Sequence, residues 1–452
     1  MRFQRVFKRV FSHLRIVHRN ENAGNHTCST AVRSINHPSI IEGDPLRGTV
    51  TDTRTSPQSY HMVSLLLLVA LVAAVFVGFN IGGSSTGVAW GPPVGARITS
   101  KTGAAALMTV FVFLGGWTVG RNVIATLGGD LVPQTIFSTE ASIVVLGFIG
   151  LGMLLANLYG VPVSTSMTAV GAIAGLGLAT GELDYGVLGS IMVWWAIAPV
   201  LGFWFGVIIG RYLYSYLDQK FALEQSSGPL FTLDRSGILP TPELGPGTTP
   251  REAVSTVVVL AIACYMSFSA GASNVANAVA PLVGGGLIGT GNAVILATVA
   301  IGVGAFTIAR RTMESVGNDL TDLPLLAATI VMVVAASITT VASALGIPMS
   351  LALSTVMCIV GLGWGRATRP TGAVDLARGD VKTDISVDAI TAETGDEVDP
   401  VGEEDPRNVQ DAQQLFDPSS VVRFVAFWII GPSIATALSY LAFLVLPIAG
   451  TA

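Results

Sequence analysis

Long apolar runs dominate the chain from Met62 onward, and they decide which folds are open to it. An α-helix rises 1.5 Å per residue, so a run of about 20 apolar residues crosses the roughly 30 Å hydrocarbon core of a bilayer. Only 12% of the 452 residues are charged, about half the share of a soluble domain. The sequence therefore predicts an all-α, multi-pass protein of the cell membrane with about ten transmembrane segments. The ten runs are Met62–Ile81, Gly103–Ile124, Ala141–Tyr159, Val163–Thr180, Val187–Tyr212, Ala253–Gly271, Asn292–Ala309, Leu325–Leu345, Met349–Trp364 and Val421–Leu446.

Composition divides the chain into six regions. Residues 1–61 carry nine of the 24 Lys and Arg and no run of membrane length, which predicts a disordered basic tail. Met62 begins an apolar run that is typical of the start of a membrane protein. We therefore expect that translation could begin at Met62 and that the tail is an over-extension of the gene model. The other regions are a first membrane repeat (62–214), a cytoplasmic linker (215–250), the first part of a second membrane repeat (251–365), an acidic cytoplasmic loop (366–420), and the last transmembrane helix with the C-terminus (421–452).

The membrane core has few charged residues, histidines and cysteines, and this scarcity excludes several classes of protein. The core has too few basic residues to build a nucleic-acid surface. Cys28, Cys264 and Cys358 are too widely spaced for a metal cluster, and all five histidines precede Met62. Without histidine or an evident carboxylate pair within a span, the core lacks the parts of a metal site or of acid–base catalysis. We expect no catalytic residues, no bound metal and no cofactor.

The membrane core contains an internal repeat. An offset of 189 residues places Gly82–Ala89 on Gly271–Ala278, and a slightly smaller offset places Gly160–Ser164 on Gly346–Ser350. Each copy holds about five segments, an odd number, so the second copy enters the membrane from the opposite side. The sequence thus predicts two inverted five-segment repeats. With the core's N-terminus outside, fourteen of the fifteen Lys and Arg after Met62 fall on the cytoplasmic side, as the positive-inside rule requires.

Small polar side chains gather at glycine-rich stretches that recur in both halves. We predict that the helices break at Gly82–Gly95, at Gly271–Gly289 and at the turns Gly160–Ser164 and Gly346–Ser350, because irregular backbone at membrane depth is tolerated around a cavity or buried in protein. Hydroxyls, amides and the N–H groups of half-helix N-termini would there bind an oxyanion. The alternative is that these small residues serve close helix packing. The predicted anion-binding residues are Ser84, Ser85, Ser164, Thr165, Ser166, Ser273, Asn274, Asn277 and Ser350.

Four stretches of the sequence resemble the motifs of one family. Gly271–Ala278 resembles the G-A-N-D-V-A-N-A signature of the inorganic phosphate transporter family, and Arg311–Gly317 is similar to its R-T-I-E-T-V-G. Val123–Leu127 looks like its V-x-x-T-I, and Gly160–Ser166 like its G-L-P-V-S-T-T turn. The resemblance implies a permease that moves phosphate, or in some relatives sulfate, together with sodium or protons.

The chain departs from the family at the signature acids. Where the family has Asn and Asp in each half, this chain has Ser84 and Ser85 in the first half and Ser273 and Asn274 in the second. In family members those aspartates are implicated in cation binding. Their loss puts that coupling in doubt or shifts it to other acids.

Three other acids are candidates for cation coupling. Glu314 falls where the family keeps a Glu, and Asp130 and Asp319 are equivalent positions of the repeat. An ionisable group within a span is costly and is by default a functional hypothesis. The alternative for Asp130 and Asp319 is that they are solvated helix-end residues.

Together these features favour a secondary transporter of inorganic phosphate that works by alternating access and is coupled to sodium or protons. Sulfate or another oxyanion is the alternative substrate. A passive anion channel lined by glycine-rich breaks is the rival from another class, and an intramembrane enzyme is disfavoured for the reasons above. Membrane lipid is the expected surrounding, nucleic acid is not a partner, and a homodimer is compatible with the sequence.

Overall fold

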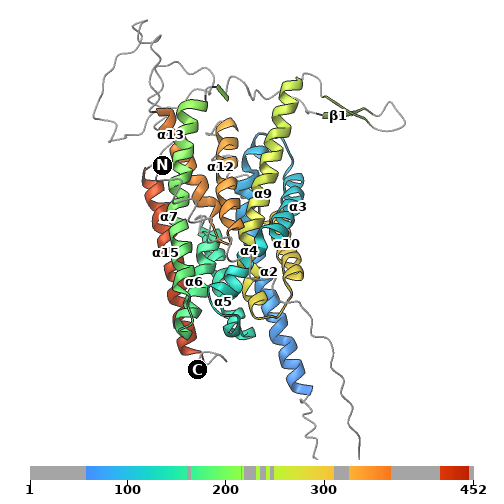
Figure 1. Ribbon diagram of the computed structural model, residues 1–452. Coiled ribbons are helices and arrows are strands. Elements are labelled where there is room, and N and C mark those ends of the chain that lie inside the picture. Colours follow the sequence, from blue (N-terminus) through green and yellow to red (C-terminus); the bar gives the residue numbers. More distant parts are fainter. Residues whose placement is uncertain are drawn as a thin grey trace, which may run out of the picture. The chain divides into compact units, whose positions relative to one another are not determined.

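The computed structural model describes residues 57–159, 164–214, 216–217, 231–234, 241–244, 249–309, 325–367 and 418–446. Helices make up the membrane core (Figure 1), and β1 (Phe231–Asp234) pairs antiparallel with β2 (Thr241–Leu244) in the linker. The helices are α2 (Pro57–Gly95), α3 (Lys101–Thr118), α4 (Gly120–Ala125), η1 (Thr126–Asp130), η2 (Gln134–Ile136), α5 (Thr139–Tyr159), α6 (Thr165–Thr180), α7 (Tyr185–Ile208), η3 (Ile209–Leu213), α9 (Pro250–Gly284), α10 (Thr290–Thr307), α12 (Leu325–Ala344), α13 (Leu351–Ala367) and α15 (Pro418–Val445).

Six helices of the described part are long and apolar enough to cross a membrane, and a bent pair raises the number to seven. The six are formed by α2, α7, α9, α10, α12 and α15, and the bent pair is α3 with the α4–η1 segment. Shorter apolar helices of 10–17 residues are α6, α13 and the Thr139–Leu155 part of α5, although α5 as a whole has 21 residues. The membrane-spanning helical fold is as expected, and the described residues do not confirm about ten crossing segments. The first helix begins at Pro57, five residues before the predicted start at Met62.

The predicted breaks at Gly82–Gly95 and Gly271–Gly289 are wrong for most of their length. Helix α2 continues without interruption to Gly95, and α9 to Gly284. The glycines serve close packing instead, because a Cβ at Gly82 would lie 2.0 Å from the main-chain oxygen of Ile301 in α10. A Cβ at Gly271 would lie 2.2 Å from that of Val112 in α3. Small residues let helix backbones approach this closely.

The bent span lies elsewhere, at Val119. There α3 ends and α4 begins, with a bend of 62° between α3 and the α4–η1 segment. Val119 still donates its main-chain N–H to Gly115 O, so the first helix closes its last turn before the chain changes direction. The π-helix η1 then carries Thr126 and Asp130 to the end of the span.

Helix bounds match between the two halves of the chain. Adding 189 to both ends of α3 gives both ends of α10, and adding 189 to the last residue of α2 gives the last residue of α9. Adding 186 to the first residue of α6 gives that of α13. The packing is matched too: α2 packs on α10 as α9 packs on α3, and α6 packs on α15 as α13 packs on α7 (Figure 1). The duplicated unit is therefore visible in the elements and in their partners.

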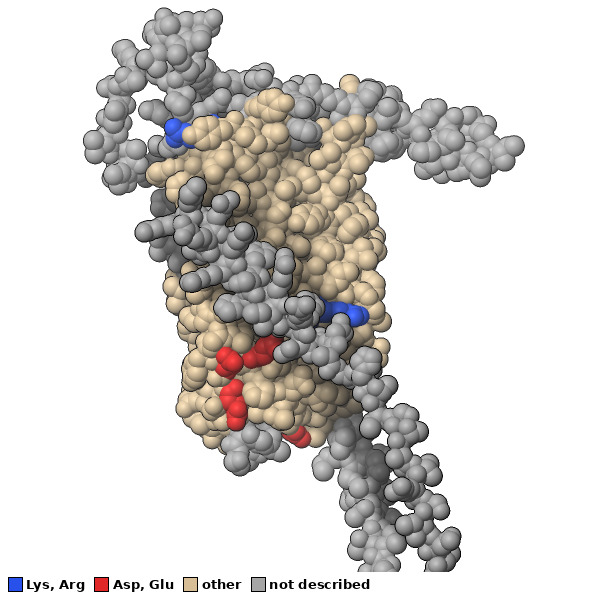
Figure 2. Space-filling view, in the orientation of Figure 1, with Lys and Arg blue, Asp and Glu red and all other residues tan. Residues whose placement is uncertain are grey.

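Charges differ between the ends of the helices. Asp184 caps the N-terminus of α7, and Arg211 lies in η3 at its other end. A helix of this length spans about 36 Å, so the two charges lie on opposite sides of an apolar layer. On the face in Figure 2 the acidic side chains gather in the lower part, and basic side chains appear at the upper end and at mid-height. The assignment of the Arg211 end to the cytoplasm stays a prediction.

Candidate functional site

Two equivalent short helices begin inside the protein, each with a serine cap. Ser164 Oγ accepts from the main-chain N–H of Met167 (3.3 Å) at the start of α6. Ser350 Oγ accepts from that of Leu353 (3.3 Å) at the start of α13. Both serines are buried, with 4% of their surface exposed. A helix N-terminus carries a partial positive charge and N–H groups without intrahelical partners, so each start is a potential anion contact at a depth that water does not reach.

A chain of hydrogen bonds joins these two helix starts to α9. Ser166 Oγ, in the first turn of α6, donates to the main-chain oxygen of Met349, which lies just before α13 (3.0 Å). Asn277 Nδ2 of α9 donates to Ser166 Oγ (3.0 Å). Ser166 and Asn277 are each 1% exposed. One serine and one asparagine therefore tie together elements from both halves of the protein.

The chain continues across the contact between α9 and α2. Asn277 Nδ2 also donates to Asn274 Oδ1 (3.3 Å), and Asn274 Nδ2 donates to Ser85 Oγ (3.3 Å). Ser85 and Asn274 are 189 residues apart, which is the repeat offset. A two-fold relation between two halves would bring equivalent residues into contact on its axis. The inverted arrangement of the two halves stays a prediction.

The structure brings four of the nine predicted anion-binding residues into this chain: Ser85, Ser166, Asn274 and Asn277. The two capping serines, Ser164 and Ser350, lie next to it in sequence. Ser84 bonds back to its own helix, donating to Asn80 O (3.3 Å) and Ile81 O (3.2 Å).

Two further predicted residues are buried beside the chain. Ser273 is 0% exposed, and its Oγ has no hydrogen-bond partner among the described residues. Thr165, the first residue of α6, is 7% exposed. Thr165 adds a hydroxyl group at the start of α6, and Ser273 adds one in α9 next to Asn274 in sequence.

The site carries no formal charge. Among the described residues, every buried polar side chain belongs to Ser, Thr or Asn. An anion there would meet hydroxyl, amide and main-chain donors instead of Lys or Arg. Such neutral donors are effective at helix N-termini because the site excludes water.

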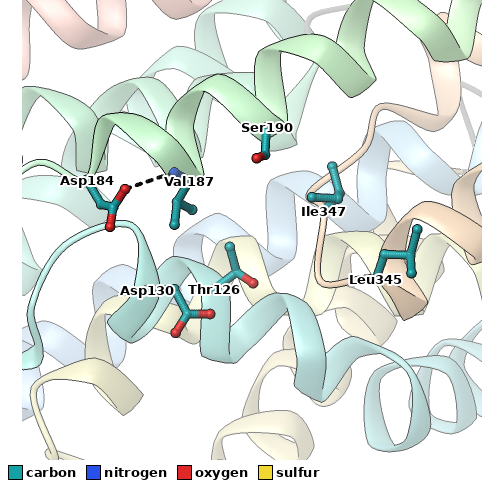
Figure 3. Close-up of a pocket in the computed structure, with 7 residues that line it drawn as sticks. All are labelled: Thr126, Asp130, Asp184, Val187, Ser190, Leu345 and Ile347. Carbon is teal, nitrogen blue, oxygen red and sulfur yellow. Dashed lines mark hydrogen bonds between the residues drawn. The ribbon is translucent and has the colours of Figure 1, made fainter. Parts of the chain in front are cut away.

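A cavity of about 500 Å³ lies between η1, α7 and the turn before α13 (Figure 3), and its lining includes none of the residues of the hydrogen-bonded chain. Asp130 and Thr126 of η1 line it together with Asp184 and Ser190 of α7, and Ile347, two residues before Met349, completes the wall. Asp184 Oδ1 accepts from the main-chain N–H groups of Gly186 (2.8 Å) and Val187 (2.9 Å). Its charge is thereby partly offset by the N-terminus of α7. Of the predicted coupling acids, Asp130 lines this cavity, whereas Glu314 and Asp319 lie outside the described residues.

Two positioning residues escaped the sequence analysis. Trp195 Nε1 of α7 donates to Pro348 O (2.8 Å), and Asn122 Nδ2 of α4 donates to Ala344 O (2.9 Å). Both bonds hold the turn that leads into α13, where Gly346 adopts a φ of 77°. The signal for Trp195 is its place in the repeated Trp-x-x-x-Pro motif, which recurs at Trp428. The turn that presents Met349 is therefore fixed by residues of the first repeat.

Comparison with known proteins identifies the family. The model of the phosphate transporter family matches residues 81–439, which is most of the chain. The chain belongs to the phosphate transporter family. The match includes both copies of the repeat and all the residues of the hydrogen-bonded chain.

Members of the phosphate transporter family differ in the substrates that their names give. The chain is 28% identical over 300 residues to the sulfate permease CysP of Bacillus subtilis, which covers 66% of this chain and 77% of that protein. It is 25% identical over 393 residues to a protein of Chlamydia trachomatis named "Putative phosphate permease", with 68% and 91% covered. A solved structure titled "The sodium-dependent phosphate transporter" superposes with a TM-score of 0.55 at 18% identity, covering 84% of this chain and 100% of that one. This structure shares the fold, and the chain is a multi-pass protein of the cell membrane.

Proposed function

We propose that this member of the phosphate transporter family is a secondary transporter that carries inorganic phosphate across the cell membrane. One observation carries the proposal: buried neutral donors from four elements converge where two helices begin inside the protein. The anion would be held by the first turns of α6 and α13 and by the side chains of Ser85, Ser273 and Asn274, while Ser166, whose hydroxyl proton goes to Met349 O, positions these elements. The relatives named as phosphate permeases support phosphate as the first substrate.

Alternating access between two inverted repeats is the mechanism that we propose. Each half has a first long helix, a second helix, a short buried helix start and a last long helix in the same order. If α5 with α6, and α12 with α13, enter and return, each half crosses three times. Three is odd, as five is, so the second half is still inverted. A pair of segments that enters and returns leaves every later loop on the same side of the membrane as two full crossings would. The distribution of Lys and Arg therefore still supports the orientation with the core's N-terminus outside.

We further propose that proton coupling has moved away from the centre. Ser85 and Asn274 occupy the two positions where the family has aspartate, and they face each other at 3.3 Å. Two carboxylates so placed could bind a cation or share a proton, whereas a hydroxyl and an amide can hold sodium but cannot accept and release a proton near neutral pH. Asp130 lines a cavity beside the turn that precedes α13, which supports it as a coupling acid, with Glu314 and Asp319 as the remaining candidates.

Sulfate is the second candidate substrate, favoured by the 28% identity to a sulfate permease. Uptake of labelled phosphate and of labelled sulfate into proteoliposomes, with and without sodium and pH gradients, tests the proposal. We expect saturable, gradient-driven phosphate uptake. A flux that increases linearly with concentration and ignores both gradients would support a passive channel instead.

Coupling through Asp130 gives a first prediction. Asp130→Asn keeps the size of the side chain but removes its charge, so cation-driven phosphate accumulation should fall about tenfold or more while phosphate exchange persists, because exchange moves no net cation. Glu314→Gln and Asp319→Asn test the other two candidates in the same assay. Asp184→Asn is the matched control in the cavity wall, since its Oδ1 already serves the helix cap. Full accumulation in all three coupling variants would exclude this assignment.

Restoring the family carboxylate gives a second prediction. In Asn274→Asp the new carboxylate faces Ser85 Oγ, which can turn and donate to it, so the acid can be accommodated. Phosphate uptake should then depend more steeply on sodium or proton concentration than in the wild type. Ser85→Asp places the same charge at the equivalent position and should act alike. Cation dependence unchanged in both variants would show that the centre of the repeat takes no part in coupling.

A further inference from the structure

Which groups donate and which accept along the hydrogen-bonded chain is determined by its Met349 end. The main-chain oxygen of Met349 can only accept, so it takes the single hydroxyl proton of Ser166. Ser166 Oγ is then left as an acceptor toward Asn277. The group of Asn277 that faces Ser166 must therefore be Nδ2, the donor, and the orientation of this amide follows from the network.

This orientation leaves Asn277 Oδ1 without a donor. Nδ2 gives its two protons to Ser166 Oγ and Asn274 Oδ1, while Oδ1 is buried with no hydrogen-bond partner among the described residues. The other serine and threonine side chains whose buried oxygen has no partner in the described part carry hydroxyl groups, each of which has a proton to donate. Asn277 Oδ1 is thus the one such atom that can accept but not donate.

We infer that Asn277 Oδ1 accepts the P–OH proton of the transported phosphate and thereby distinguishes phosphate from sulfate. This inference rests on the proposed function and assigns its substrate preference. Near neutral pH inorganic phosphate keeps at least one P–OH group, whereas sulfate has none. Bound phosphate would satisfy both the donors at the helix starts and this acceptor. Bound sulfate would leave the acceptor buried and unpaired, and a site built to bond a substrate hydroxyl discriminates strongly against an analogue that lacks it.

Analogues of phosphate test this inference on the unaltered full-length protein. Arsenate keeps the protonated hydroxyl, while monofluorophosphate is a tetrahedral dianion of similar size in which fluorine replaces it. In competition with labelled phosphate, arsenate should compete about as well as phosphate, and monofluorophosphate and sulfate should each be about tenfold weaker or more. Equal competition by all four anions would overturn the inference but leave the proposed oxyanion site standing. Failure of every tetrahedral anion, phosphate included, to bind would overturn both.

A pair of variants tests the residue. Asn277→Asp places a stronger acceptor at the same position but also removes the Nδ2 donor, so uptake of both anions should fall, while the ratio of phosphate to sulfate affinity should rise by about tenfold. Asn80→Asp adds the same charge at a buried amide of α2 outside the hydrogen-bonded chain, and should leave the ratio close to that of the wild type. A ratio that changes equally in both variants would show that charge alone sets the preference, and the role of Asn277 would be refuted.

Discussion

Gly271→Ala should prevent normal packing of the membrane core and lower the apparent melting temperature of the purified protein by about 5 °C or more. The added Cβ would lie 2.2 Å from Val112 O, 2.7 Å from Val112 Cα and 2.8 Å from Val112 C. All three are main-chain atoms, so no rotamer change can relieve the clash, and α9 and α3 must separate. Thermal unfolding in detergent, followed by size-exclusion chromatography, measures the effect.

The repeat supplies a second test of the same prediction. Gly82→Ala makes the equivalent contact in the other half, 2.0 Å from Ile301 O, and should be as damaging. Gly147→Ala in α5 is the control, because nothing lies within 4 Å of a Cβ at that position. If Gly271→Ala melts like Gly147→Ala, the close approach of α9 and α3 is not what holds these helices together.

The same glycines show what sequence can and cannot settle. A glycine-rich stretch in an apolar run is compatible with a broken helix or with close helix packing, and both alternatives were open at Gly82 and Gly271. The choice depends on whether another backbone lies against the glycine, here those of Ile301 and Val112. That information is tertiary, so the predicted breaks were wrong although the stretches themselves were well chosen.

The bend at Val119 was not predicted from the sequence. No proline lies near it, and the apolar run from Gly103 to Ile124 continues through it. The bend depends on packing of α4 against α9 and on the contact of Asn122 with the turn before α13. By contrast, the meeting of Ser85 with Asn274 follows from the repeat, because equivalent residues of two related helices meet where those helices cross. The repeat therefore accounts for this contact, whereas the local pattern does not account for the bend, and the anion-binding role of these residues stays a prediction.

The cavity wall shows a third limit. Asp184 directly precedes an apolar run, and its role as the cap of α7 is a local feature that sequence can indicate. That Asp184 and Asp130 line one cavity is not local, since η1 and α7 are separated by α5 and α6. The proximity of two residues so far apart in sequence can be seen only in the three-dimensional fold.

Removing the central amide should abolish transport. Asn277→Leu keeps nearly the same volume but leaves Ser166 Oγ and Asn274 Oδ1 without the donor that each now has. An unpaired buried polar group costs about 1–3 kcal/mol, and here two such groups lie where the anion would be held. Uptake of labelled phosphate should fall about 100-fold or more.

The control for this variant must also remove a buried polar group from the core. Thr298→Val does so in α10, where Thr298 Oγ1 is buried and has no hydrogen-bond partner among the described residues. Exchanging an unpartnered hydroxyl for a methyl group breaks no bond, so uptake should stay within about twofold of the wild type. Comparing the two variants at equal amounts of folded protein in the membrane separates loss of the site from loss of the fold. Wild-type uptake by Asn277→Leu would mean that the hydrogen-bonded chain from Met349 to Ser85 holds helices together and does not contact the anion.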